Sequence, residues 1–297
     1  MSISKIEIAE EYKRIQDEIC HGIEKLDGKS SFLEDLWDRE EGGGGRTRVL
    51  SNGDLIEKGG VNFSAVHGPV SEAMNKQLGL NGSEFFATGV SIVLHPHNPF
   101  VPIIHMNIRY FELDTGEYWF GGGIDLTPHY IVPEMAKLFH DRLKTICDKY
   151  DPNFYPRFKQ WADEYFFIPH RNETRGIGGV FYDHLNENNS LSKEQIFAFS
   201  CELGRAFVGV YSEQVNQRNK PYSEENLAWR NYRRGRYVEF NLVHDKGTLF
   251  GLKTNGRIES ILMSLPPHVQ WHYDHHPVAG SEEEKLIQVL EKPVDWI

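Results

Sequence analysis

The sequence predicts an α+β fold in which a large antiparallel β-sheet is flanked by helices on both faces. Extended segments rich in β-branched and aromatic residues fill the middle of the chain, between about residues 46 and 122. The links between these segments are too short for a helical crossover, so neighbouring strands are expected to be antiparallel. Apolar residues with a helical period precede and follow this region, which places helices on both sides of it along the chain.

The N-terminal part combines a helix with a hairpin. Apolar residues recur at steps of three and four from Ile8 to Leu26, which is one face of an amphipathic helix. A second short helix is expected over residues 30–41, and the glycines at 42–45 indicate a surface loop. Asn52-Gly53 lies between two short extended runs and predicts a tight hairpin turn.

The rest of the chain is assigned in order from periodicity and from helix start signals such as Pro133. Strands are predicted at 61–68, 85–96, 101–113 and 116–122, and helices at 133–150, 155–166 and 193–217. Residues 236–243, 247–254 and 257–265 predict a return to strand with a turn at Asn255-Gly256, and residues 281–292 a closing helix. No repeat or interdomain linker is visible, so residues 1–297 are expected to form a single domain.

Composition and charge exclude several classes of protein. The 297 residues carry a formal net charge of -11, with 39% hydrophobic and 25% charged residues, as in a globular protein. Apolar runs fall short of the ~20 residues that span a bilayer, and the acidic balance argues against nucleic acid as a partner. The three cysteines form no CxxC pair, which argues against a disulfide framework or a metal cluster. The acidic N-terminus lacks targeting features, so a cytoplasmic location is expected.

The segment from Val101 to Leu113 is the most informative for chemistry. Side chains alternate along a strand, so His105, Asn107 and Arg109 share one face and apolar residues occupy the other. The preceding strand places Ser91 and His95 on one face in the same way. Such a row is either an ordinary solvent face or a polar wall inside a cleft.

Further candidates follow two glycine-rich segments. Gly121–Gly123 indicate a sharp turn or a close approach of the backbone, and Asp125 beyond them is either a turn or helix cap or an acceptor for ligand N–H groups. Arg175 precedes another glycine-rich turn, and Arg257 follows Asn255-Gly256. Both arginines could bind a carboxylate. Arg175 could equally form a structural ion pair, and Arg257 could be a solvated residue at a loop tip. The 14 histidines show no HExxH spacing, so the metal signal is weak.

Four blocks together carry a family resemblance: GVNFSAVHG, GVSIVLHPHNPFVPIIHMNIRYFE, WFGGGIDLTP with YPRFKQWADEYFFIPHRNETRGIGGVFYD, and RGRYVEFNLVHDKGTLFGLKTNGRIESILMSLPP. They resemble oxygen-dependent coproporphyrinogen III oxidase, from about Gly60 to the C-terminus, with residues 1–59 less diagnostic. The resemblance implies oxidative decarboxylation of two propionates of coproporphyrinogen III to vinyl groups, giving protoporphyrinogen IX in haem biosynthesis. Molecular oxygen is the implied co-substrate, carbon dioxide and hydrogen peroxide are released, and no organic cofactor is needed.

The resemblance also implies roles for individual residues. His105 matches the proton donor, and Asp125 matches a carboxylate that engages pyrrole N–H groups. The family's substrate-contacting positions match Ser91, Asn107, Ile108, Arg109, Asn255, Gly256 and Arg257. The family also has positions assigned to a divalent metal, and these match His95, His105, His140 and His170. The reaction is not expected to require this metal. Because the substrate carries four carboxylates, Arg109, Arg175 and Arg257 are expected to supply local positive charge.

The family is homodimeric, and the region from Tyr237 to Gln270 matches its dimerisation segment. Three alternatives to this interpretation exist. A radical enzyme for the same step would need a CxxxCxxC motif, which the sequence lacks. A non-catalytic tetrapyrrole-binding carrier and a metal hydrolase built on the histidines stay open to experiment.

Overall fold

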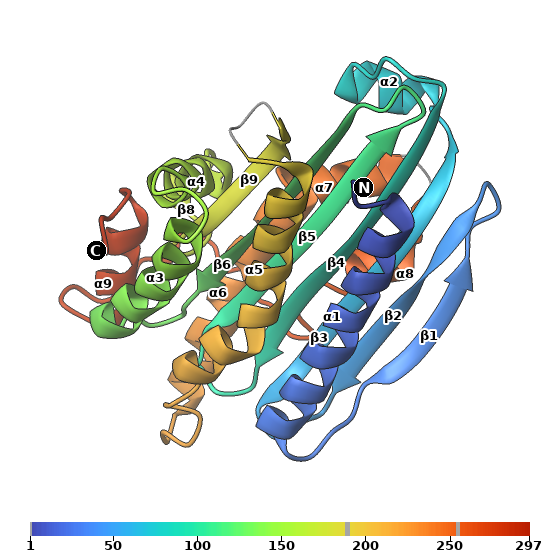
Figure 1. Cartoon of the computed structure of the whole chain (residues 1–297). Helices are drawn as coiled ribbons and strands as arrows, with labels where there is room; N and C mark the ends of the chain where they lie inside the picture. Colours follow the sequence, from blue (N-terminus) through green and yellow to red (C-terminus); the bar gives the residue numbers. More distant parts are fainter. Residues whose placement is uncertain (1, 188–190, 254–255) are drawn as a thin grey trace.

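The centre of the molecule is a seven-stranded antiparallel sheet with strand order β1-β2-β3-β4-β5-β6-β9 (Figure 1). The computed structural model describes residues 2–187, 191–253 and 256–297. The strands of the sheet are β1 (Leu33–Asp38), β2 (Gly43–Ser51), β3 (Ile56–Pro69), β4 (Glu84–Pro96), β5 (Ile103–Leu113), β6 (Tyr118–Thr127) and β9 (Gly179–Leu185). A separate short pair consists of β7 (Phe167–Ile168) and β8 (Glu173–Thr174).

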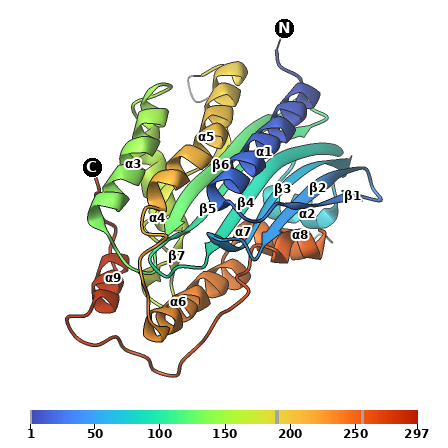
Figure 2. The ribbon, with the colours of Figure 1, turned by 90° about the horizontal axis from the view of Figure 1, so that it is seen from below.

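Helices cover both faces of this sheet, as the sequence predicts. In Figures 1 and 2, α1, α3 and α5 lie on one face and α6, α7 and α8 on the other. The helices are α1 (Lys5–Asp27), α2 (Glu72–Leu78), α3 (Pro133–Asp148), α4 (Phe154–Tyr165), α5 (Lys193–Gln214), α6 (Glu224–Val243), α7 (Lys246–Lys253), α8 (Ile258–Leu262) and α9 (Glu282–Leu290). None of the helices in the described part of the chain is long and apolar enough to cross a membrane.

The first helix forms where its sequence pattern predicts. Ser4 caps its N-terminus in a reciprocal capping box with Glu7, and Gly28 ends it with a left-handed φ of 82°. Its apolar stripe, which includes Ile15 and Ile19, is buried in the main core against the sheet. Each fully buried isoleucine contributes about 1.5–3 kcal/mol.

The hairpin at Asn52-Gly53 is confirmed, but the segment before it differs from the prediction. Residues 33–38 form the edge strand β1 instead of a helix. Most side chains of β1 are exposed, so its sequence has no apolar periodicity that would distinguish a strand from a helix. The glycines at 43–45 belong to β2 and are not a loop. A Cβ at Gly43 would lie 2.2 Å from the Ala65 carbonyl oxygen, so close strand packing explains this glycine.

The strands predicted at 236–243, 247–254 and 257–265 are wrong, because the described residues there form α6, α7 and α8. Ser223 and Asn226 form a capping box that starts α6, and Tyr237, Phe240 and Asn241 are buried at helical spacing. Gly256 leads into α8 and not into a hairpin strand. Its expected turn partner, Asn255, lies outside the described residues.

Candidate active site

The predicted polar row forms on the sheet face that α6, α7 and α8 cover. The register pairs Ser91 with Asn107 and Asn107 with Gly123, while His105 pairs with Asp125. Side chains at paired positions share a face, so these groups and Arg109 point to the same side. We call Ser91, His105, Asn107 and Arg109 the polar wall. Ile108 is fully buried on the opposite face, so its side chain is not part of the polar wall.

Asp125 lies at the buried end of the polar wall, inside β6 and not at a turn or helix cap. Its Oδ1 accepts a hydrogen bond from His105 Nδ1 at 2.7 Å, and its Oδ2 accepts one from Arg175 Nη2 at 2.8 Å. The side chains of Asp125 and Arg175 are each 2% exposed. Burial by itself raises the pKa of Asp125, but the charge of Arg175 and the hydrogen bond from His105 hold the pKa below its usual value.

Arg175 is enclosed by aromatic rings. Its guanidinium carbon lies 4.4 Å from the ring centroid of Phe166, 4.6 Å from that of Tyr237 and 4.7 Å from that of Phe240. Its Nη1 donates to Asn241 Oδ1 at 2.8 Å. Both terminal nitrogens of Arg175 are therefore engaged inside the protein, and its charge is directed at Asp125.

His105 links this buried pair to the wall. Its side chain is 17% exposed, and its Nδ1 faces Asp125. Because the two ring nitrogens lie on opposite sides of the imidazole, Nε2 points away from the carboxylate. A buried carboxylate that fixes one ring nitrogen also sets the tautomer and orientation of the ring, which suits a group that transfers protons at the other nitrogen.

Glycines surround the exposed part of the wall. Gly89 and Gly121 both pair with Arg109, and Gly123 pairs with Asn107. A Cβ at Gly121 would lie 2.6 Å from Arg109 Nε and 2.7 Å from an Asp183 carboxylate oxygen. The triple glycine therefore marks a close approach, one of the two predicted explanations, because the Arg109 and Asp183 side chains pack directly over Gly121.

Arg109 is the accessible cation of the wall. Its side chain is 39% exposed, its Nη2 lies 3.1 Å from Asp183 Oδ2, and its guanidinium carbon lies 5.9 Å from the Phe181 ring centroid. Asp183 itself is 26% exposed, so the pair is reachable from solvent. This is the arrangement expected of an arginine that exchanges one carboxylate partner for another.

Arg257 lies on the same side of the sheet, at the start of α8, but it is not brought together with Arg109. It forms an ion pair with Asp35 of β1 and donates from Nη1 to Ser260 Oγ at 3.1 Å. Ser260 in turn accepts from Asn62 Nδ2 through its carbonyl oxygen at 2.6 Å, which fixes α8 against β3.

The four histidines matched to metal positions do not converge on one centre. His95 donates from Nε2 to the Ser264 carbonyl at 2.8 Å, and His170 contacts His244 and Glu239. His140 is on α3, across the sheet from His105, and its two nitrogens bond the Tyr155 hydroxyl and the Ile177 carbonyl, each at 3.0 Å. Within residues 2–187, 191–253 and 256–297, no group of three His, Cys, Asp or Glu side chains could hold a metal ion. The residues present do not fit a shared metal site.

Comparison with known protein families shows which family the chain belongs to. The model of the family described as coproporphyrinogen III oxidase matches residues 7–296. The chain belongs to the coproporphyrinogen III oxidase family.

Curated relatives of this oxidase family agree. The chain is 49% identical over 298 residues to "Coproporphyrinogen-III oxidase 1, chloroplastic" of Arabidopsis thaliana, with 95% of this chain and 76% of the relative covered. It is 48% identical over 309 residues to "Oxygen-dependent coproporphyrinogen-III oxidase" of Parasynechococcus marenigrum, covering 95% and 85%. The protein of the same name from Prochlorococcus marinus is 47% identical over 308 residues, covering 95% and 90%.

Asn241 and Asp183 contact two candidate residues of this oxidase, Arg175 and Arg109, and neither was predicted as a site residue from the sequence. Asn241 is not recognisable as a partner of Arg175 when its segment is predicted as a strand. Its spacing from Tyr237 and Phe240 is helical and is the signal that could have placed it on their face. Asp183 stands beyond the glycine-rich turn that follows Arg175, but its position in the sequence indicates no role for it. Its pairing with Arg109 depends on the placement of β9 beside β6, which no local pattern reveals.

Proposed function

We propose that this chain catalyses the oxygen-dependent oxidative decarboxylation of two propionates of coproporphyrinogen III. In each round a propionate loses carbon dioxide and a β-hydrogen to become a vinyl group, and two electrons pass to molecular oxygen. Each round also consumes one proton from solvent. One propionate group, one oxygen molecule and one proton thus give one vinyl group, one carbon dioxide and one hydrogen peroxide. Two rounds give protoporphyrinogen IX. Family membership and the names of the relatives support this proposal.

The observation that carries it is the buried array Asn241–Arg175–Asp125–His105. Because both oxygens of Asp125 are engaged, we assign it the role of orienting His105 and not of binding pyrrole N–H groups itself. His105 then transfers the proton that the reaction consumes, through Nε2 on the side of the polar wall. Arg175 acts as a fixed counter-charge for Asp125 and not as a propionate ligand.

Arg109 is the proposed propionate ligand. The protein has a formal charge of -11, so a tetracarboxylate substrate needs a local cation that is reachable. A charge-assisted hydrogen bond from Arg109 would contribute about 1.5–3 kcal/mol. Ser91 and Asn107 add polar groups beside it. Gly256 and Arg257, which lie between α7 and α8, are proposed contacts at the far side, together with Asn255 by family resemblance.

The remaining proposals concern assembly and location. Homodimerisation through the region from Tyr237 to Gln270 is supported by exposed apolar side chains there: Leu242, Val243, Leu252 and Ile258. Residues 1–297 are proposed to act as one domain. A cytoplasmic location is supported by three buried free cysteines, which suit a reducing compartment. No step is assigned to a metal, because the four histidines have separate protein partners.

The test is turnover of metal-stripped protein with coproporphyrinogen III, in air and without oxygen, with the products separated by chromatography. Protoporphyrin should form only in air. A tetrapyrrole carrier, the alternative, would bind substrate and yield no protoporphyrin under either condition. His105→Gln should abolish turnover while the protein stays folded by circular dichroism. His276→Gln, at a side chain that is 81% exposed, is the matched control and should leave turnover unchanged.

A further inference from the structure

We propose that Tyr165 is a positioning residue that holds α7 over the polar wall and thereby sets the space in which the macrocycle binds. The inference deepens the proposed function and rests on it, because it assumes that Arg109 binds a propionate. Tyr165 is the last residue of α4. Its hydroxyl and its ring make separate contacts, and together they join the start of α7 to the surroundings of Arg109.

The hydroxyl of Tyr165 holds the start of α7. It donates a hydrogen bond to Asp245 Oδ1 at 2.8 Å and accepts one from the backbone N–H of Lys246 at 3.2 Å. The other carboxylate oxygen of Asp245 accepts a hydrogen bond from Thr248 N at 2.7 Å, which caps the first turn of α7. The capping residue and the first residue of α7 are therefore both bonded to one side chain of α4.

The ring of Tyr165 is packed between the aromatic partners of two arginines. It stacks on Phe181 with the ring centroids 4.1 Å apart and the planes at 13°. Phe181 is the ring that lies 5.9 Å from the guanidinium carbon of Arg109. The centroid of Tyr165 also lies 5.1 Å from that of Phe166, one of the rings that enclose Arg175. The site thus fixes the ring, and the ring fixes the hydroxyl that holds α7.

The two points at which α7 is attached lie on either side of Arg109. Phe181 pairs with β6 two residues after the partner of Arg109 in that strand. Phe250 of α7 packs against a buried cluster that includes Trp119, two residues before the same partner. Held at one point through Tyr165 and at the other through Phe250, α7 spans the part of the wall that contains Arg109. Figure 2 shows the helix on this face of the sheet.

A macrocycle bound over the wall must fit between the sheet and α7. Without the Tyr165 hydroxyl, the Asp245 carboxylate and the Lys246 N–H each lose a partner, and the start of α7 can move away from the wall. A binding space that is not preorganised binds its ligand more weakly, because part of the interaction free energy is consumed in ordering it. The array around Asp125 keeps its own partners, so the loss should fall on substrate binding and not on proton transfer.

The test combines steady-state kinetics with hydrogen exchange. Tyr165→Phe keeps the ring and removes the hydroxyl. It should raise KM for coproporphyrinogen III by about threefold or more, with kcat within about twofold of the wild type. The amides of residues 246–253 should exchange faster, because the start of α7 opens more often. Asp245→Ala should raise KM at least as much, and adding Tyr165→Phe to it should raise KM no further, because the shared bond is already broken.

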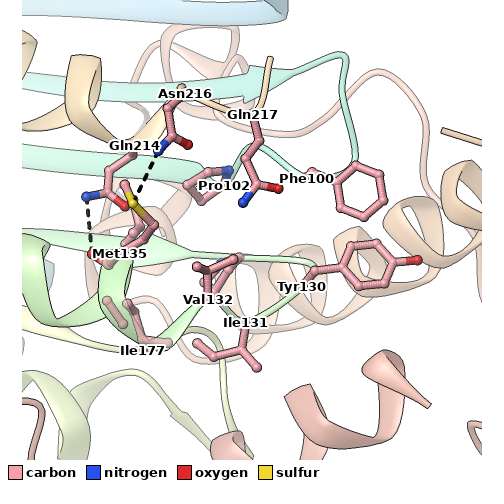
Figure 3. Close-up of a pocket in the computed structure, with 13 residues that line it drawn as sticks. Phe100, Pro102, Tyr130, Ile131, Val132, Met135, Ile177, Gln214, Asn216 and Gln217 are labelled. Atoms are coloured by element: carbon pink, nitrogen blue, oxygen red, sulfur yellow. Dashed lines mark hydrogen bonds between the residues drawn. The ribbon is translucent and has the colours of Figure 1, made fainter. Parts of the chain in front are cut away.

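Tyr130→Phe is the matched control. Figure 3 shows Tyr130 at a hollow between α3, the end of α5 and the end of β6, which a backbone layer separates from the polar wall. Its hydroxyl has the same kinds of partner as that of Tyr165, because it donates to Glu283 Oε1 and accepts from Asn226 Nδ2, each at 2.8 Å. The control should change neither KM nor the exchange of α7.

The outcomes separate this inference from the proposed function. Unchanged exchange of α7 in Tyr165→Phe would overturn the anchoring role. Faster exchange with an unchanged KM, or a KM that rises equally in Tyr130→Phe, would overturn the role in substrate binding while wild-type turnover stands. If the wild type makes no protoporphyrin in air, the proposed function fails, and the role of Tyr165 in substrate binding fails with it whatever the exchange shows.

Discussion

The change Arg175→Met tests whether the buried Arg175–Asp125 pair organises the site. Methionine keeps a long apolar side chain against the three surrounding rings but removes the charge. Asp125 would then be a carboxylate with 2% exposure that keeps the hydrogen bond from His105 but loses the one from Arg175. Breaking a buried ion pair by removing one partner costs about 3–5 kcal/mol, because the other charge is left uncompensated. We expect a loss of this size in the free energy of unfolding at pH 7.

The difference in the free energy of unfolding between the wild type and Arg175→Met depends on pH, and the direction of each pKa shift gives the sign of that dependence. In the wild type the pKa of Asp125 is held below its ordinary value of 3.8, so its stabilisation is complete above pH 3.8 and is lost as pH falls through the lowered pKa. Without Arg175, burial should raise that pKa above 3.8. The variant then gains stability relative to its unfolded state as pH falls toward 3.8. The stability gap between the two proteins should therefore be largest near pH 7 and shrink in acid.

Urea unfolding followed by tryptophan fluorescence at pH 7 and pH 5 measures this gap. Arg142→Met is the matched control, since Arg142 is 53% exposed in its pair with Glu213 and such surface pairs contribute about 0–1 kcal/mol. Adding Asp125→Asn to Arg175→Met should recover part of the loss, because the uncompensated charge is removed. A loss below about 1 kcal/mol for Arg175→Met, equal to that of Arg142→Met, would refute the reasoning.

Three further predictions concern the wall, the array and the cysteines. Arg109→Gln should raise KM for coproporphyrinogen III by roughly 10- to 150-fold, which corresponds to 1.5–3 kcal/mol, whereas Asp183→Asn should lower KM because it frees the arginine from its internal partner. Steady-state kinetics measure both, and a higher KM in Asp183→Asn would count against Arg109 as the propionate ligand. Asn241→Ala removes the acceptor for Arg175 Nη1 and should lower kcat about tenfold or more with KM unchanged, while Asn241→Asp, which keeps an acceptor, should recover activity; a change in KM alone would contradict a positioning role. The three buried cysteines should not react with a thiol reagent at pH 8 in the folded protein and should all react in urea, because burial raises the pKa of Cys147 to about 12; reaction of a native thiol within minutes would show that the core opens readily.

The sheet and its main polar face were predictable because strand alternation is a local signal. His105, Asn107 and Arg109 fall on one face in any strand that contains them, and the apolar stripe of α1 is equally local. The helix α6 was not predictable in the same way. Its buried face contains arginines, among them Arg233, which forms a buried pair with Glu173, so the apolar stripe that marks most helices is interrupted.

The array around Asp125 shows a second limit. The residue was singled out as a candidate, but its two partners lie on different elements, Arg175 being 50 residues away along the chain. Only the register between β5 and β6 and the return of the chain after β8 bring them together. Of the two explanations that residue type leaves open for Arg175, carboxylate recognition and a structural ion pair, the structure shows the ion pair, with Asp125.

The spread of the array along the chain also bears on how the protein matures during synthesis. Its members come from β5, β6, the segment after β8, and α6, and Asn241 is residue 241 of 297. A nascent chain that has emerged only as far as β9 has all seven sheet strands but lacks the helix whose rings and amide immobilise the guanidinium. The array around Asp125 is thus complete only once α6 has been synthesised and has packed against the sheet.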